Sequence, residues 1–279
     1  MNTQQPERLW KYRAWNDDGH ARRMIVDGEI YFATVAKLND PFEFRWREKL
    51  PDTPAEIDLY CRDLCAVAHP NDTPAQRRIH FKRLKRELTG AAAIAKGRAM
   101  PTVARIDHGV FSASEVYDDL LMWSHYADNH KGICVGIRTD RIVGKRFKRV
   151  EYADVVPVLD VWKYAHPDAD AFMNLGLTKS SHWRYEKEWR TINAPGAKAF
   201  PECVDRVIFG AQVSDKTATE VWECVKSANH KIEILFARQS PKLYGLIVRK
   251  PLELLTHDDE EWQAMLHRNA QLRKHSYPV

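Results

Sequence analysis

The chain has 279 residues, of which 44% are hydrophobic and 29% charged, with a formal net charge of +5. It contains 9 Trp and 10 Tyr residues, enough to build an aromatic-rich core, so the composition excludes a mostly disordered chain. No apolar run approaches the roughly 18 residues that a membrane-spanning helix needs, which excludes a helical membrane protein.

The cysteines and the first residues bear on the compartment. The 5 cysteines are odd in number and include no Cys-x-x-Cys pair, which predicts free, mostly buried thiols. The segment Met1–Glu7 is polar and lacks the apolar stretch of a secretory signal, so we expect a cytoplasmic protein without a membrane partner. The length suits one compact mixed domain. We therefore expect a single α+β domain over residues 1–279.

The first predicted element is a strand. Leu9–Arg13 alternates large apolar and basic residues, which places Lys11 and Arg13 on one face. These cations either form a solvated strand face or hold the diphosphate or ribose of a ligand, because arginine offers a bidentate fork and lysine a point charge. An Asn-Asp-Pro turn at residues 39–41 follows, since proline drives the residue before it out of the helical region.

Two helices are predicted next, and both begin with the same capping signal. A threonine cap, a proline at the first helical position and Glu or Gln at the third start helices at Thr53 and Thr73. Together they predict a helical insertion at about residues 53–100. The second helix is basic, and its cations either form a solvated face or track a phosphate backbone. The candidates for that contact are Arg77, Arg78, Lys82, Arg83, Lys85 and Arg86.

A short strand at residues 109–114 places Ser112 and Ser114 on one face and leads into a helix that runs to about Asn129. One interpretation is capping, because Ser112 and Glu115 have capping-box spacing and Ser114 is also placed to cap this helix. The alternative is functional: one hydroxyl holds a ligand ribose or orients a catalytic carboxylate.

A later strand at residues 185–192 places Glu186, Glu188 and Arg190 on one face. Two carboxylates on one face repel each other, which raises the pKa of at least one and suits acid, base or cation-stabilising work. The plainer interpretation is an exposed strand face on which Arg190 neutralises a glutamate.

The other elements follow from apolar runs and turn signals. His125 and His130 are too poorly spaced to align two ligands on one helix face, so no metal is predicted. We expect strands at residues 132–137, 150–158 and 207–210, a helix from Ser214 to Lys226, a strand pair at 232–236 and 243–248, and a last helix capped by Thr256.

Four marks together resemble a widespread bacterial family of uncharacterised proteins that often occur among phage-defence genes. They span most of the chain. The marks are WKYR at residues 10–13, NDPFE at 39–43, MWSHYA at 122–127 with Lys131-Gly132, and WRYEKEWR at 183–190.

A second resemblance rests on three short motifs in order: a basic strand, a Ser-x-Ser strand leading into a helix, and a Glu-x-Glu strand. This order is similar to that of ADP-ribosyltransferases. It implies an α+β fold with a mostly antiparallel split sheet, here with an inserted helical pair. It also implies that NAD is the substrate and that no metal takes part.

The resemblance assigns roles residue by residue. Glu188 stabilises the positive charge that develops on the ribose as the nicotinamide bond breaks, and Glu186 orients the acceptor nucleophile. NAD binding falls to Lys11 or Arg13 with Tyr12 between them, and to Ser112 and Ser114, of which Ser112 helps to hold the nicotinamide ribose.

The expected function is therefore transfer of ADP-ribose from NAD to a macromolecular acceptor, nucleic acid or protein, as a phage-defence toxin. One alternative is a non-catalytic protein that binds nucleic acid or a defence-system partner through the basic helix. The other is a metal-dependent nuclease built on Asp40, Glu43, Glu186 and Glu188.

Overall fold

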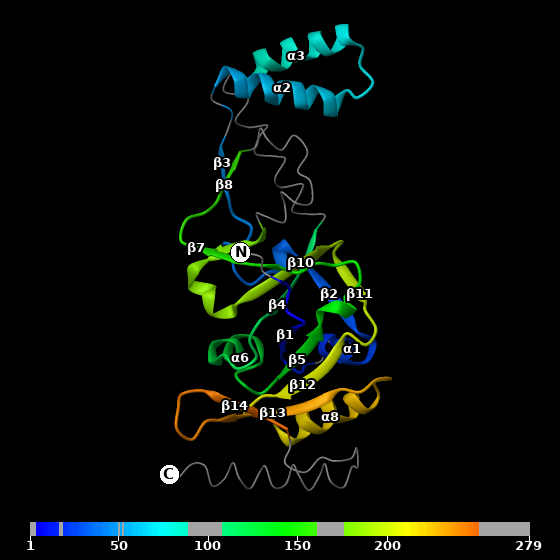
Figure 1. Ribbon diagram of the computed structural model, residues 1–279, viewed down its shortest axis with the longest axis vertical. Helices are drawn as coiled ribbons and strands as arrows, with labels where there is room; N and C mark the ends of the chain where they lie inside the picture. The colour runs from blue at the N-terminus through cyan, green and yellow to red at the C-terminus, as the bar shows by residue number, and fades with distance from the viewer. Residues whose placement is uncertain are drawn as a thin grey trace.

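The computed structural model describes residues 4–16, 19–49, 51, 53–88, 108–160 and 176–250, and the statements below concern these residues. They form a mixed fold built on one open, mostly antiparallel sheet of ten strands, as Figure 1 shows. The strand order is β11-β2-β4-β1-β5-β12-β13-β14, and β10 and β6 lie off this path. The prediction of a mixed fold of helices and strands with a mostly antiparallel sheet is thus confirmed.

The strands of this sheet have the following bounds. They are β1 Arg8–Arg13, β2 Glu29–Thr34, β4 Gly109–Ser114, β5 Ile133–Arg138, β6 Lys148–Arg149, β10 Glu188–Asn193, β11 Gly196–Ala199, β12 Val204–Phe209, β13 Glu233–Gln239 and β14 Leu246–Arg249. The pair β12 and β13 is parallel, and helix α8 (Asp215–Lys226) makes the crossover that a parallel pair requires.

Helices cover both faces of the sheet (Figure 1). Residues of α1 (His20–Asp27) and α8 pack with Leu9 of β1 and Trp189 of β10 in the larger core. Helix α6 (Leu120–Tyr126) packs on the other face, where Trp123 is fully buried beside Trp10 and Tyr12. Strand β1 therefore alternates between two apolar layers, which is why its odd and even residues have different surroundings.

Strand β4 is the branch point of the sheet. Strand β10 pairs with it along its whole length, from Glu188 opposite Ser114 to Asn193 opposite Gly109. A strand has only two edges, so β1 and β2 must share the other one. Strand β1 pairs at Ser114, and β2 pairs at Val110 and Gly109. The two strands diverge between these points, and the sheet forks beside residues 111–113.

The predicted helical pair is present as α2 (Pro54–Ala68) and α3 (Pro74–Leu88), which lie side by side at one end of the molecule (Figure 1). Both capping signals are confirmed. Glu56 N donates to Thr53 Oγ1 at 3.2 Å, and Thr53 N donates to the Glu56 carboxylate at 3.3 Å. Thr73 and Gln76 make the same exchange at the start of α3. Residues 89–100 of the predicted insertion lie outside the described residues, as does the last predicted helix.

Shorter elements complete the structure. Strand β3 (Arg47–Lys49) pairs in parallel with β8 (Val158–Asp160), and β7 (Glu151–Ala153) pairs in parallel with β9 (Thr178–Ser180). The single strand predicted at residues 150–158 is thus two strands in different small sheets. Three 3-10 helices are present among the described residues: η1 Val35–Lys37, η2 Thr139–Arg141 and η4 Ser181–Glu186.

All 5 cysteines are free and buried, as predicted. No described helix combines the length and the apolar character needed to cross a bilayer.

Candidate active site

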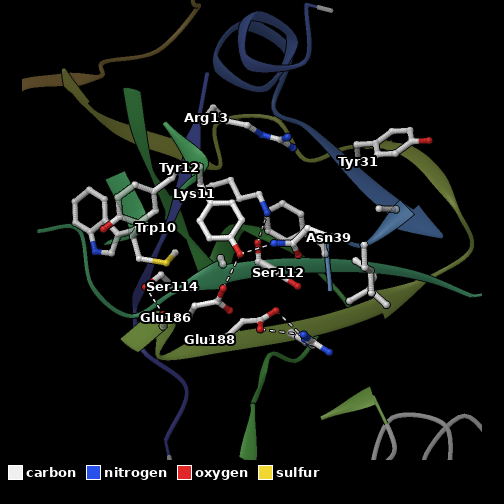
Figure 2. Close-up of a pocket in the computed structure, with 18 of the residues that line it drawn as sticks. Trp10, Lys11, Tyr12, Arg13, Tyr31, Asn39, Ser112, Ser114, Glu186 and Glu188 are labelled. Carbon is white, nitrogen blue, oxygen red and sulfur yellow. Dashed lines mark hydrogen bonds and ion pairs between the residues drawn. The ribbon is translucent and has the colours of Figure 1, made fainter. Parts of the chain in front are cut away.

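A cavity of about 390 Å³ opens at the fork of the sheet, where β1 and β2 part along β4. Residues from all three predicted motifs line it, as Figure 2 shows. In that view Arg13 lies on one side, Glu186 and Glu188 lie on the other, and Lys11 and Ser112 lie between them. The lining residues from the motifs are Lys11, Tyr12, Arg13, Ser112, Ser114, Glu186 and Glu188.

The two carboxylates reach the cavity by a different route from the one that the sequence predicts. Glu186 ends the 3-10 helix η4, Lys187 has a φ of 42° in the left-handed region, and β10 begins only at Glu188. The expected single strand over residues 185–192 is therefore wrong for its first part. The backbone bends at Lys187 and aims both acids at the same cluster.

Ser114 holds this bend in place. Its hydroxyl donates to the carbonyl oxygen of Glu186 at 2.6 Å and accepts from Val116 N at 3.1 Å. Both hydrogen-bonding functions of the hydroxyl are thus used, and the side chain is only 2% exposed. Ser114 positions the backbone under Glu186.

Neither serine caps the following helix, so the capping interpretation is wrong. Helix α6 begins at Leu120, and the carboxylate of Asp119 accepts from the backbone N–H groups of Leu121 and Met122 at 2.9 and 3.0 Å. The helix also ends at Tyr126, earlier than predicted, because residues 128–130 all have positive φ.

Five buried charges form the floor of the site. Three are carboxylates, of Glu43, Glu186 and Glu188, and two are cations, of Lys179 and Arg190, which leaves one negative charge in excess when all are ionised. Lys179 Nζ lies 2.6 Å from Glu186, 3.2 Å from Glu188 and 3.1 Å from Glu43. One ammonium is therefore shared by three acids.

Arg190 binds two of the same acids. Its Nε and NH2 donate to the two carboxylate oxygens of Glu188 at 2.7 and 2.9 Å, a bidentate pair. NH2 also donates to Glu43 at 2.8 Å, and NH1 donates to the carbonyl of Gly176 at 2.5 Å. Arg190 does neutralise a glutamate, but in a buried cluster and not on the exposed face of the plainer interpretation.

The surroundings of Glu186 and Glu188 shift the pKa values of these two acids in opposite directions. Burial raises the pKa of Glu186. The attraction of Lys179, which three carboxylates share, lowers that pKa but does not offset the effect of burial. Burial alone would also raise the pKa of Glu188, but the ion pairs with Arg190 and Lys179 and a hydrogen bond from Ser112 outweigh it and lower that pKa. Burial by itself would lower the pKa of Lys179, yet the three carboxylates raise it, so Lys179 stays protonated.

A chain of neutral groups reaches Glu186 from the far side. Asn39 Nδ2 donates to the hydroxyl of Tyr126 at 2.8 Å, and that hydroxyl donates to Glu186 Oε1 at 2.6 Å. Burial and the nearby carboxylate raise the pKa of Tyr126, so its hydroxyl remains a donor. Figure 2 shows Asn39 and Glu186 at the two ends of this chain.

Lys11 and Tyr12 have separate surroundings although they are neighbours in β1. Lys11 Nζ donates to the carbonyl of Ser112 at 2.6 Å, and burial, with Arg13 nearby, lowers the pKa of Lys11 to about 7. Tyr12 is 3% exposed, packs edge-on against Trp123 with ring centroids 5.3 Å apart, and donates to the carbonyl of Val116 at 3.0 Å. The hydroxyl of Tyr12 is thus engaged in the protein interior.

The predicted nucleic-acid contacts of α3 lie on the helical pair and not at the cavity. Arg77 donates to the carbonyl of Pro70 at 3.1 Å, Arg83 pairs with Glu87 at 3.0 Å, and Lys85 pairs with Asp58 of α2. The side chains of Arg77, Arg78, Lys82, Arg83 and Arg86 are exposed, and that of Lys85 is half-buried.

Sequence reasoning missed several residues of the site. Asn39 lies in NDPFE and Tyr126 lies in MWSHYA, so the family marks were an available signal for them. Glu43, also in NDPFE, was named only for the nuclease alternative. Lys179 carries no motif, and nothing in the sequence around it distinguishes it from a surface lysine.

The comparisons with known proteins cover part of this site. A family model described as a protein of unknown function (DUF2971) matches residues 122–191. The matched segment includes Tyr126, Lys179, Glu186 and Glu188 and supports membership of this segment in an uncharacterised domain family. Neither the comparison with curated proteins nor that with solved structures produced a match.

Proposed function

We propose that this chain cleaves NAD at the bond between nicotinamide and ribose and transfers ADP-ribose to a macromolecular acceptor. The observation that carries the proposal is the meeting of the cations of β1, the serines of β4 and the carboxylates beside β10 in one cavity. The fork that opens this cavity supports the resemblance to the split sheet of ADP-ribosyltransferases.

The different proton affinities of the two acids suit two different tasks. Glu188 has a lowered pKa, so it remains ionised and can stabilise the cationic ribose of the transition state, while Ser112 orients it. Glu186 has a raised pKa and is therefore suited to accept a proton from the attacking group. In many active sites, two neighbouring acids whose surroundings give them different pKa values take the acid and the base roles.

The far side of the cavity is assigned to the rest of NAD. Lys11 and Arg13 line it from β1, and Tyr31 of β2 also lines it, as Figure 2 shows. Cations of this kind bind a diphosphate, and a volume of about 390 Å³ is within the range of cofactor pockets. The acceptor is then expected next to Glu186, on the side of Tyr126.

The test is release of nicotinamide from NAD labelled in the nicotinamide ring. We expect the wild-type protein to release label and Glu188→Gln to lower the rate by at least about 100-fold. The matched control is Glu115→Gln, an exposed glutamate close to the same strand. Because Glu188 is buried, the circular dichroism and melting temperature of the variant must be compared with those of the wild type.

A second label locates the acceptor and separates the two acids. NAD labelled in the adenylate part is incubated with the protein and total cell extract, and label is sought in nucleic acid and in protein. We expect Glu186→Gln to reduce this transfer more than it reduces hydrolysis of NAD by water. Equal losses in both assays would remove the proposed division of labour. A role as a phage-defence toxin rests on this activity and on the family resemblance.

The nuclease alternative has less support. Glu43, Glu186 and Glu188 do meet, but each already pairs with Lys179 or Arg190, so a metal ion would have to displace those cations. Asp40 lies outside the cluster of ion pairs and accepts from the backbone N–H of Phe42 at 2.8 Å. Nicotinamide release that survives a chelator would separate the NAD chemistry from a metal-dependent reaction.

Nucleic-acid binding through α3 is the second candidate function, because Arg78 and Lys82 present exposed cations on one short helix. Such binding is recognised by an affinity for nucleic acid that falls steeply as the salt concentration rises. Replacing both residues with glutamine should reduce the salt slope, whereas the Glu188→Gln variant should leave it unchanged.

A further inference from the structure

Three side chains with metal-ligating atoms meet at the turn between α2 and α3. His69 follows the last residue of α2, Asp72 precedes the threonine that caps α3, and His80 lies within α3. An imidazole nitrogen of each histidine and a carboxylate oxygen of Asp72 all lie within 4.8 Å of one another. We propose that His69, Asp72 and His80 bind a divalent transition-metal ion of the zinc type and thereby join the two helices.

The geometry is close to what such an ion needs. Zinc bonds to imidazole and carboxylate of about 2.0–2.2 Å in a tetrahedral site place ligand atoms roughly 3.3 Å apart. The three ligand atoms must therefore converge by no more than about 1.5 Å from their present separation. The two imidazole rings lie with their centroids 4.0 Å apart and their planes inclined at 31°. His69 is exposed, so its ring can rotate without disturbing a packed core.

The turn is held in a shape that keeps the ligands together. His80 Nδ1 lies 2.7 Å from Asp72 Oδ2, so these two atoms are already in contact and would separate by roughly 0.6 Å if both bound the ion. Asp72 N donates to the carbonyl of His69 at 3.2 Å, and the capping exchange of Thr73 follows directly. The side chain of Asp72 is only 14% exposed and that of His80 33%, so the site is partly sheltered from water.

The ligand types select the class of ion. Two imidazoles and one carboxylate favour zinc and its transition-metal neighbours over magnesium and calcium, which prefer oxygen ligands throughout. Three protein ligands leave a fourth position for water. The site lies on the helical pair, away from the cavity at the fork, so we assign it a structural role.

That role follows from the position of the site on the hairpin. Lys85 of α3 pairs with Asp58 of α2 near one end of the two helices. His69 and Asp72 lie at the other end, where the chain turns, and His80 meets them from the middle of α3. A metal ion at the turn would complement the ion pair and fix how α3 presents its basic side chains.

The experiment is titration of the full-length protein, treated with chelator and free of affinity tags, with Co²⁺ as a spectroscopic substitute for zinc. We expect a visible d–d absorption that saturates at one equivalent and is abolished when Zn²⁺ displaces the cobalt. His69→Gln, Asp72→Asn and His80→Ala should each weaken binding by at least about 10-fold, and zinc should raise the melting temperature of the wild type only.

His182→Ala is the matched control, because His182 is exposed and belongs to another element. It should bind cobalt like the wild type. His69→Gln changes an exposed side chain, so its helical content, measured by circular dichroism, should equal that of the wild type and its loss of binding cannot be due to unfolding. No d–d band in the wild type, or an unchanged band in His69→Gln and Asp72→Asn, would overturn the proposal and leave only a hydrogen-bonded turn.

Discussion

Lys11 spans the fork in the sheet and donates its side-chain N–H to the main-chain carbonyl of Ser112 at 2.6 Å. The paired strands provide no partner on that edge of β4 at this position, because β1 and β2 meet β4 only on either side of it. The ammonium also lies 5.1 Å from the ring centroid of Phe111. A lysine side chain thus takes the place of a backbone donor at the fork.

The first prediction concerns stability against pH. Burial lowers the pKa of Lys11 in the folded protein to about 7, whereas an unfolded lysine titrates near about 10.4. Between these values the unfolded chain binds more protons, so the contribution of Lys11 to stability rises with pH, by at most about 1.4 kcal/mol per unit. Lys11→Met should lose this rise, and Lys198→Met, at an exposed lysine, should keep it. Urea unfolding from pH 6 to about 10 measures the difference.

The second prediction concerns NAD affinity. If Lys11 binds the diphosphate, it must do so as the ammonium form. Affinity should therefore fall as the pH rises above about 7, towards tenfold per unit at the limit of a single proton. Lys11→Arg should flatten this dependence, because arginine stays charged. Calorimetric titration at several pH values is the measurement, and an affinity independent of pH in the wild type would exclude Lys11 from the diphosphate site.

The third prediction concerns Tyr126. Its hydroxyl donates to the carboxylate of Glu186 and so stabilises the ionised form of that acid. Tyr126→Phe removes the donor, which should raise the pKa of Glu186 further and move the acidic limb of the transfer rate to higher pH. Tyr185→Phe is the control, since the Tyr185 hydroxyl contacts His125 instead. An acidic limb that stays in place would show that Glu186 is not the base.

The fourth prediction concerns Arg190. Its removal leaves Glu188 without its bidentate partner and Glu43 with Lys179 alone in a buried site. Arg190→Met should therefore reduce the free energy of unfolding by about 3–5 kcal/mol. Arg141→Met breaks the exposed pair with Glu202, whose closest atoms are 3.5 Å apart, and should cost less than about 1 kcal/mol. Denaturant titration of both variants tests the contrast.

The sequence was informative where local rules decide the outcome. Helix caps depend on residues three positions apart, and the caps of α2 and α3 are as predicted at Thr53 and Thr73. The period-2 pattern of β1 also holds, with Lys11 and Arg13 at the cavity. These features need only short-range geometry.

The sequence was insufficient where distant segments decide the outcome. Glu186-Lys187-Glu188 reads as a strand, but Ser114, 72 positions away from Glu186, fixes a bend there instead. Lys179 acquires its role because Glu43, from a distant segment, meets Glu186 and Glu188, which lie 7 and 9 positions after it. The motifs therefore indicated the two acids and Arg190, but nothing local indicated that Lys179 and Glu43 join them.

Strand β10 also ties the candidate site to the rest of the fold. Glu188 and Arg190 face the ionic cluster, whereas Trp189 between them packs in the larger apolar core. A slip of β10 by one residue along β4 would exchange these faces, burying unpaired charge among apolar side chains. Molecules with this shifted pairing are therefore strongly disfavoured. The register of β10 on β4 that completes the apolar core also brings the acidic side chains into the site.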